Sequence, residues 1–215
     1  MSNLNKRILT SIIVLPFSLF FILKGGNYIV SFLYAILILG NYEVFSVFKR
    51  KTTIIFLDVI LVISLLSILN LRNETMSSFV LLIWVITITI SSDVGGYIFG
   101  KYFKWKKITK ISPNKTLSGV LGSLIFSLIS VFLLEIFVQN FIKFEIEILT
   151  QPKYYLLAIV LSLAAQLGDL CISYLKRLEN LKDTGKMLPG HGGLFDRIDG
   201  LMFVLIFSAF FSYLK

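Results

Sequence analysis

Two aspartates three residues apart, Asp196 and Asp199, open the last apolar segment of the chain. If that segment is a helix, both carboxylates project from one side of its first turn and repel each other unless a cation lies between them. Oxygen ligands suit Mg²⁺, so the pair favours a magnesium site. The alternative for Asp196 is an ordinary helix N-cap, and the spacing alone leaves both interpretations open.

A third aspartate, Asp169, lies inside an apolar stretch, where a carboxylate without a partner is costly. At about 100° per residue, Gln166, Asp169, Ser173 and Lys176 share one helical stripe. The stripe aligns an acceptor, a hydroxyl and a cation toward the polar loop that follows. We expect Asp169 to join the two later aspartates around the metal. The alternative is an ion pair with Lys176 or with a cation from another helix.

The polar loop before Asp196 combines glycines with cations. Gly190, Gly192 and Gly193 flank His191, and such a loop can bring backbone N–H groups close to a phosphate beside a helix start. A glycine-rich loop is a weak signal by itself. The surrounding basic residues favour a phosphate here: Lys176, Arg177, Lys182, Lys186 and Arg197. In a second polar loop, 93–116, Lys115 and Thr116 are candidates for phosphate contact; the alternative is a solvated basic loop touching lipid headgroups.

Composition indicates which elements position these residues. The chain has 215 residues, 56% of them hydrophobic, and only 15% charged against roughly 25% in soluble domains. Its mean hydropathy is +0.86. These values indicate a polytopic membrane protein. The net charge of +9 then reflects cations beside membrane spans rather than nucleic-acid binding. With one cysteine and one histidine, any metal chemistry must use oxygen ligands.

We predict an all-α, single-domain membrane protein over residues 1–215, with about seven transmembrane helices (range six to nine). The first candidate span contains Pro16 and has the basic flank of a signal peptide, but no small-residue cleavage site follows, so we expect it to stay uncleaved. Residues 93–104 are too polar for a confident span and leave an eighth, re-entrant element open. The candidate spans are 8–23, 28–48, 53–71, 77–92, 117–138, 154–174 and 198–214.

The distribution of cations predicts the orientation. With the N-terminus in the cytoplasm, the inside segments carry 16 of the 21 Lys and Arg residues, and the loops 93–116 and 175–197 share that side. The active site is therefore predicted at the cytoplasmic interface. Three further acidic residues in apolar segments, Glu43, Asp58 and Glu135, are interpreted as structural or interfacial.

Twelve positions between residues 173 and 199 follow the pattern S-x-x-K-R-x4-K-D-x5-P-x-H-G-G-x-x-D-R-x-D. This pattern resembles the signature of the phosphatidate cytidylyltransferase (CDP-diglyceride synthase) family. The segments around Asp93, Gly100-Lys101 and Ile111–Thr116 also look like that family's first cytoplasmic loop, so the likeness covers roughly 91–200. The chain departs from the family where Leu117-Ser118-Gly119 replaces Trp-Glu-Gly, and it is shorter than many members.

The resemblance implies that CTP and phosphatidic acid react to give CDP-diacylglycerol and pyrophosphate, in phospholipid biosynthesis at the bacterial inner membrane. It implies Mg²⁺, with a second cation left open, and a homodimer. The metal ligands would be Asp169, Asp196 and Asp199. The cations neutralising phosphates would be Lys176, Arg177 and Arg197. Substrate and phosphate contacts would come from Ser173, Lys182, Asp183, His191, Gly192, Gly193, Asp93, Lys115 and Thr116.

Three alternatives to this reaction follow from the same residues. The first is a related nucleotidyltransferase that uses another nucleotide or another lipid phosphate. The second is an enzyme that consumes CDP-diacylglycerol, but the D-G-x-x-A-R motif that such enzymes share does not occur in the sequence. The third is a transporter that uses Asp169 for ion passage, which paired, discontinuous helices would favour.

Overall fold

The computed structural model describes residues 3–72, 75–109, 111–139 and 151–213. Lys110, Lys143, Lys215 and the end of the last predicted span lie outside these ranges. Within them the chain is all-α, as predicted, and β-pairing is limited to two isolated bridges. The helices are α1 (Asn3–Lys24), α2 (Gly26–Val47), α3 (Lys51–Leu71), α4 (Met76–Phe103), α5 (Leu117–Phe137), α7 (Pro152–Leu178) and α8 (Phe195–Tyr213).

Each of these seven described helices corresponds to one of the seven predicted spans, although several bounds differ. Five of them, α2, α3, α4, α5 and α7, are long and apolar enough to cross a membrane, and α1 contains a shorter apolar stretch, Leu9–Lys24. Helix α8 starts with the charged residues Asp196, Arg197 and Asp199 and is apolar after them. The chain is therefore an integral membrane protein with its acidic signature at a helix start.

Residues 93–104 are not an eighth element. Helix α4 continues without a break through Asp93 to Phe103 and ends at Lys104, which adopts a left-handed conformation with φ 49°. The predicted end of this span at residue 92 is therefore wrong. Polar residues and glycines lower the hydropathy of this part of α4, but they serve contacts with other helices.

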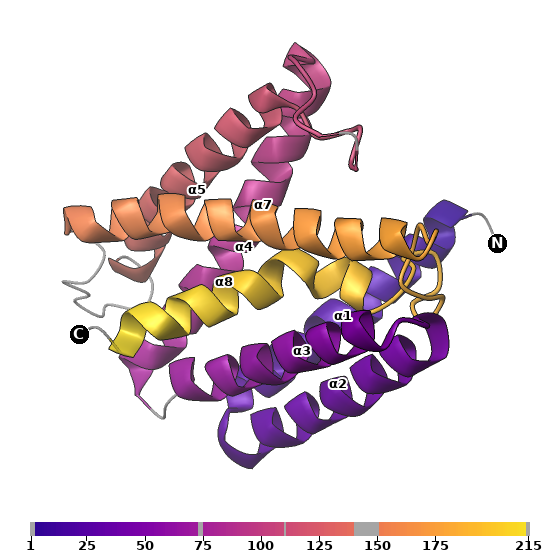
Figure 1. The fold of residues 1–215 in the computed structure, drawn as a ribbon. Coiled ribbons are helices and arrows are strands. Elements are labelled where there is room, and N and C mark those ends of the chain that lie inside the picture. Colours follow the sequence, from indigo (N-terminus) through magenta and orange to yellow (C-terminus); the bar gives the residue numbers. More distant parts are fainter. Residues whose placement is uncertain (1–2, 73–74, 110, 140–150, 214–215) are drawn as a thin grey trace.

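Glycines bring α4 and α5 into backbone contact. A Cβ on Gly95 would collide with the carbonyl of Gly122, and a Cβ on Gly119 would lie 3.0 Å from the carbonyl oxygen of Gly96. Ser123 Oγ donates to the carbonyl of Ser92 at 2.7 Å. The close approach makes α4 and α5 one hairpin, which crosses the neighbouring helices steeply (Figure 1).

Helices α7, α8, α3 and α2 run roughly side by side in Figure 1 and pack in that order. Helices α7 and α8 touch at two glycines. A Cβ on Gly168 would lie 2.9 Å from the carbonyl oxygen of Asp199, and one on Gly200 would lie 3.1 Å from that of Ala165. Because Gly168 precedes Asp169 and Gly200 follows Asp199, this contact fixes the separation of two candidate site residues.

Candidate active site

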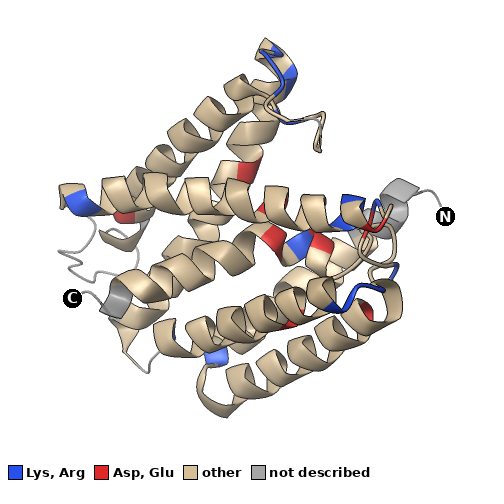
Figure 2. Cartoon of the chain, in the orientation of Figure 1, with Lys and Arg blue, Asp and Glu red and all other residues tan. Residues whose placement is uncertain are grey.

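Acidic residues of α4, α7 and α8 gather where these helices cross, in the middle of the molecule (Figure 2). The carboxylate of Asp199 lies close enough to those of Asp169 and Asp93 to be repelled by both. Asp93 is in turn repelled by Asp169 and attracted by Lys115. The structure thus brings Asp93 together with two of the aspartates that the sequence assigned to the metal.

Asp169 is paired with a cation from a distant loop. Lys115 Nζ lies 2.7 Å from Asp169 Oδ2 and also donates to the carbonyl of Gln166 at 3.1 Å. Ser173 Oγ donates to Asp169 Oδ1 at 3.2 Å, as the predicted helical stripe requires. The cation that pairs with Asp169 therefore comes from the 104–116 loop. Hydrogen bonds from Ile108 N to the carbonyl of Lys115 and from Leu117 N to the carbonyl of Lys106 hold this loop in place.

The carboxylate of Asp196 has partners on both oxygens. Lys176 Nζ lies 2.8 Å from Oδ1, and the two side chains are only 10% and 7% exposed. Oδ2 accepts hydrogen bonds from the backbone N–H groups of Thr184 at 2.8 Å and Gly193 at 3.0 Å. These contacts are not those of the N-cap that the sequence left open, because Asp196 lies within the first turn of α8 and both N–H donors precede it in the chain. The carboxylate instead connects the preceding loop and Lys176 to the start of α8.

The glycine-rich loop folds around protein carboxylates. The N–H of Gly193, expected to face a phosphate, donates to Asp196, and Gly190 and Gly192 have positive φ angles of 79° and 90°. Leu188 and Gly192 pair across the turn, where Leu188 N donates to Gly192 O at 2.9 Å. The glycines thus allow a tight turn in which the N–H of Gly193 already serves a protein carboxylate and that of His191 serves the carbonyl of Leu188.

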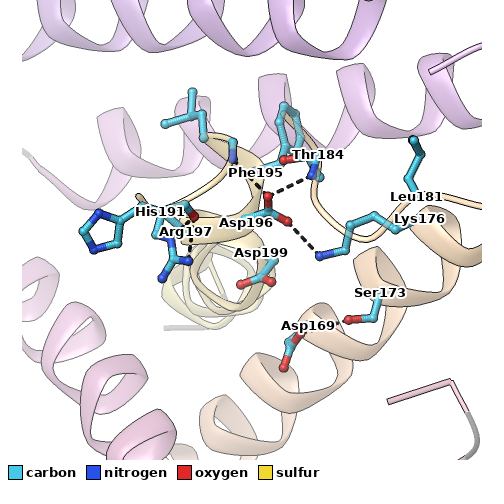
Figure 3. Close-up of polar contacts among 12 residues, drawn as sticks. Asp169, Ser173, Lys176, Leu181, Thr184, His191, Phe195, Asp196, Arg197 and Asp199 are labelled. Carbon is cyan, nitrogen blue, oxygen red and sulfur yellow. Dashed lines mark hydrogen bonds and ion pairs between the residues drawn. The ribbon is translucent and has the colours of Figure 1, made fainter. Parts of the chain in front are cut away.

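Other predicted phosphate ligands lie outside this cluster. Arg197 donates through Nε and Nη2 to the carbonyl of His191, and both residues lie on the side of α8 away from Asp169 (Figure 3). Arg177 donates to the carbonyl of Leu181 at 2.6 Å. Lys182 and Asp183 are exposed on the following loop.

Thr116 and Glu43 have roles that sequence reasoning did not identify. The hydroxyl of Thr116 caps α5 by accepting from Gly119 N at 3.1 Å, and the residue is buried. Glu43 of α2 accepts hydrogen bonds from the loop that precedes α8. The signal for Glu43 was a carboxylate in an apolar segment, which the sequence led us to interpret as structural or interfacial.

The donor chemistry of the site fits a hard divalent cation. Asp93, Asp169 and Asp199 supply only oxygen ligands; Lys115 pairs with Asp169 and attracts Asp93, and Lys176 attracts Asp199. The described residues contain no group of three or more acidic, His or Cys side chains already spaced to hold a metal. The site therefore fits a divalent cation in its charge and in the type of its ligands. A bound cation would reduce the mutual repulsion of the carboxylates.

Comparison with known proteins identifies the family. Residues 50–214 match the Cytidylyltransferase family. The phosphatidate cytidylyltransferase of Staphylococcus haemolyticus is 46% identical over 115 residues, which are 53% of this chain and 42% of that protein. The enzyme of the same name from Bacillus subtilis is 36% identical over 145 residues, 66% of this chain and 51% of that protein. The chain spans about half the length of the curated relatives it matches, and it belongs to the Cytidylyltransferase family.

Proposed function

We propose that the chain transfers a cytidylyl group from CTP to phosphatidic acid, giving CDP-diacylglycerol and pyrophosphate in phospholipid synthesis. The observation that carries the proposal is the cluster of Asp93, Asp169 and Asp199 beside Lys115 and Lys176, in a member of the Cytidylyltransferase family. Relatives named phosphatidate cytidylyltransferase support the choice of substrates.

In this reaction a phosphate oxygen of phosphatidic acid attacks the α-phosphorus of CTP. The new P–O bond forms as the bond to the bridging oxygen of the β-phosphate breaks, and pyrophosphate leaves. The nucleophile is already ionised, so no strong base is needed and His191 has no required proton to carry. The barrier is mainly the approach of two anions, which positioning and charge neutralisation lower.

We propose that Mg²⁺ binds between α7 and α8 at Asp169 and Asp199, with Asp93 as a further carboxylate that interacts with both. When bound, the ion supplies charge neutralisation for the phosphates. Asp196 acts in this proposal as the anchor of Lys176 and of the α8 start, because both its oxygens accept hydrogen bonds. Its Oδ1 becomes available to a metal only if Lys176 turns away.

Two lysines, the buried Lys176 and the half-buried Lys115, supply positive charge next to the aspartates. Lys115 and Lys176 each pair with an aspartate. We propose that they turn toward the phosphates of CTP and of phosphatidic acid once substrates bind. The sequence assigned Arg177 and Arg197 to the same task. In this proposal they lie on the outer side of the loop 179–194 and contact the part of the CTP triphosphate that extends beyond the aspartates.

We propose that the N-terminus and the segments 93–116 and 175–197, which include the ends of α4 and α7 and the loops after them, face the cytoplasm, in the bacterial cytoplasmic (inner) membrane. The excess of Lys and Arg in these segments supports this orientation. The acyl chains of phosphatidic acid then remain in the bilayer while its headgroup reaches the aspartates from the side. A homodimer is the assembly that the resemblance to the family implies.

The test is pyrophosphate release by the purified full chain in lipid nanodiscs, with CTP, Mg²⁺ and phosphatidic acid. We expect turnover that requires all three and that Asp169→Asn abolishes. Competition by other nucleotides and other lipid phosphates separates this reaction from a related one. Folded wild-type protein without turnover, or full turnover in Asp169→Asn, would overturn the proposal.

A further inference from the structure

Glu43 is a buried carboxylate in the middle of an apolar helix. It lies on α2, is 2% exposed, and precedes the residues 50–214 that match the family. Burying a carboxylate costs several kcal/mol unless hydrogen bonds replace its water. The hydrogen-bond partners of Glu43 therefore indicate the role of this buried carboxylate.

All described partners of the Glu43 carboxylate lie in the segment that leads into α8. Oε1 accepts from the Thr184 hydroxyl at 2.6 Å and from Phe195 N at 3.1 Å, and Oε2 accepts from Leu194 N at 2.6 Å. The donors are 141 to 152 positions away in the sequence. Glu43 thus ties both ends of the loop 184–195 to α2.

Two glycines of the loop leave space for this carboxylate. A Cβ on Gly185 would lie 3.2 Å from Glu43 Cγ, and a Cβ on Gly193 would collide with Glu43 Oε1 and with the Thr184 hydroxyl. Gly193 belongs to the His-Gly-Gly sequence that was expected to bind phosphate. Its lack of a side chain is therefore explained by the approach of Glu43.

The same loop holds Asp196 and, through it, Lys176. The N–H groups of Thr184 and Gly193 donate to Asp196 Oδ2, while Oδ1 accepts from Lys176. Figure 3 shows Thr184 and Phe195 beside Asp196, and Lys176 reaching across to Asp196 from α7. A continuous set of hydrogen bonds thus leads from α2, through the loop, to a cation of the site.

We propose that Glu43 is a positioning residue for the reaction: from α2 it fixes the loop 184–195, which sets the positions of Asp196 and Lys176. This inference rests on the proposed function for its kinetic part. The carboxylates of Glu43 and Asp196 also lie at the N-terminus of α8, where the helix dipole favours negative charge. A residue of α2 therefore helps to position the site, although the sequence signature of the site lies in α7, α8 and the loop between them.

Glu43→Gln tests the proposal with a minimal change in shape. One side of a glutamine amide is a donor, so it must oppose either the N–H of Leu194, which faces Oε2, or the N–H of Phe195, which faces Oε1. We expect kcat to fall by roughly 10- to 100-fold, with KM for CTP changed far less. Thr184→Val, which removes one hydrogen bond, should have a smaller effect in the same direction. Glu135→Gln is the matched control, because Glu135 is a carboxylate in α5 bonded to Tyr155.

A readout independent of turnover is the acetylation of Lys176 in the folded protein, measured by mass spectrometry. In the wild type this side chain is 10% exposed, so labelling should be slow. Faster labelling in Glu43→Gln and Thr184→Val, with Glu135→Gln unchanged, supports the proposal even if the wild type fails to use CTP. Unchanged labelling of Lys176 in both variants, or a wild-type kcat in folded Glu43→Gln, would overturn it.

Discussion

The ammonium group of Lys115, at the end of the 104–116 loop, lies 2.7 Å from the carboxylate of Asp169 in α7. A second bond from Lys115 to the carbonyl of Gln166, 51 positions away in the sequence, anchors the same side chain. The pair closes the loop onto α7 and gives the acidic cluster an internal counter-charge. Any divalent cation must therefore compete with Lys115 for Asp169.

Lys115→Met should expose this competition. Without the ammonium group, the affinity of the substrate-free protein for Mn²⁺ should rise by roughly 10-fold, equivalent to about 1.4 kcal/mol. The KM for CTP should rise as well, because a cation that faces the phosphates is lost. Electron paramagnetic resonance of free Mn²⁺ measures the first effect. Lys107→Met, an exposed cation of the same loop, is the control, and weaker Mn²⁺ binding by Lys115→Met would refute the competition.

Gly168→Ala should separate α7 from α8 at the site. The new Cβ would lie 2.9 Å from the carbonyl oxygen of Asp199 and 2.7 Å from the Phe203 ring. Overpacking of this kind costs about 1–3 kcal/mol, and the shift moves Asp199 away from Asp169. We expect a lower unfolding temperature and a loss of turnover that exceeds the loss of folded protein. Leu167→Ala, at a neighbour that is 59% exposed, should change neither.

Glu179, just after α7, predicts a pH effect on stability. Burial raises the pKa of Glu179, but the N–H groups of Lys49 and Arg50, which donate at 2.7 and 3.1 Å, more than offset this, so the net pKa lies below its usual value. A lowered folded pKa stabilises the protein above the unfolded pKa of about 4.3. This contribution is lost as the pH falls through the folded value.

Glu179→Gln should therefore lower the unfolding temperature at pH 7 by roughly 1–3 °C, a small effect because the residue is partly solvated. The difference from the wild type should shrink as the pH falls below 4.3. Thermal unfolding in detergent at several pH values measures both. A difference that is equal at every pH would contradict this origin of the stabilisation.

The sequence predicted the helices because hydropathy and length are local properties. It placed all seven, and it placed Ser173 beside Asp169 because both share one helical face. It ended α4 too early, since the glycines and polar residues after Asp93 resemble a loop in composition. Their purpose, contact with α5, is visible only when the two helices are together.

The pairing of charges could not be predicted in the same way. Four aspartates and two lysines can form several sets of ion pairs. Only the fold shows that Lys115 pairs with Asp169 and that Lys176 pairs with Asp196. Glu43 is the extreme case, because its partners lie 141 to 152 positions later. Contacts of this range exist only in the folded chain, where the segment that leads into α8 lies against Glu43 of α2, and no local pattern encodes them.

Mn²⁺ binding to Asp169→Asn, Asp196→Asn and Asp199→Asn, measured without substrates, tests most directly whether a metal lies between α7 and α8. Asp169→Asn and Asp199→Asn should each weaken binding by roughly 10- to 100-fold. Asp196→Asn should bind within about threefold of the wild type, a difference of about 0.7 kcal/mol, although it frees Lys176. Wild-type affinity in Asp199→Asn, or a loss in Asp196→Asn as large as that in Asp169→Asn, would contradict this assignment.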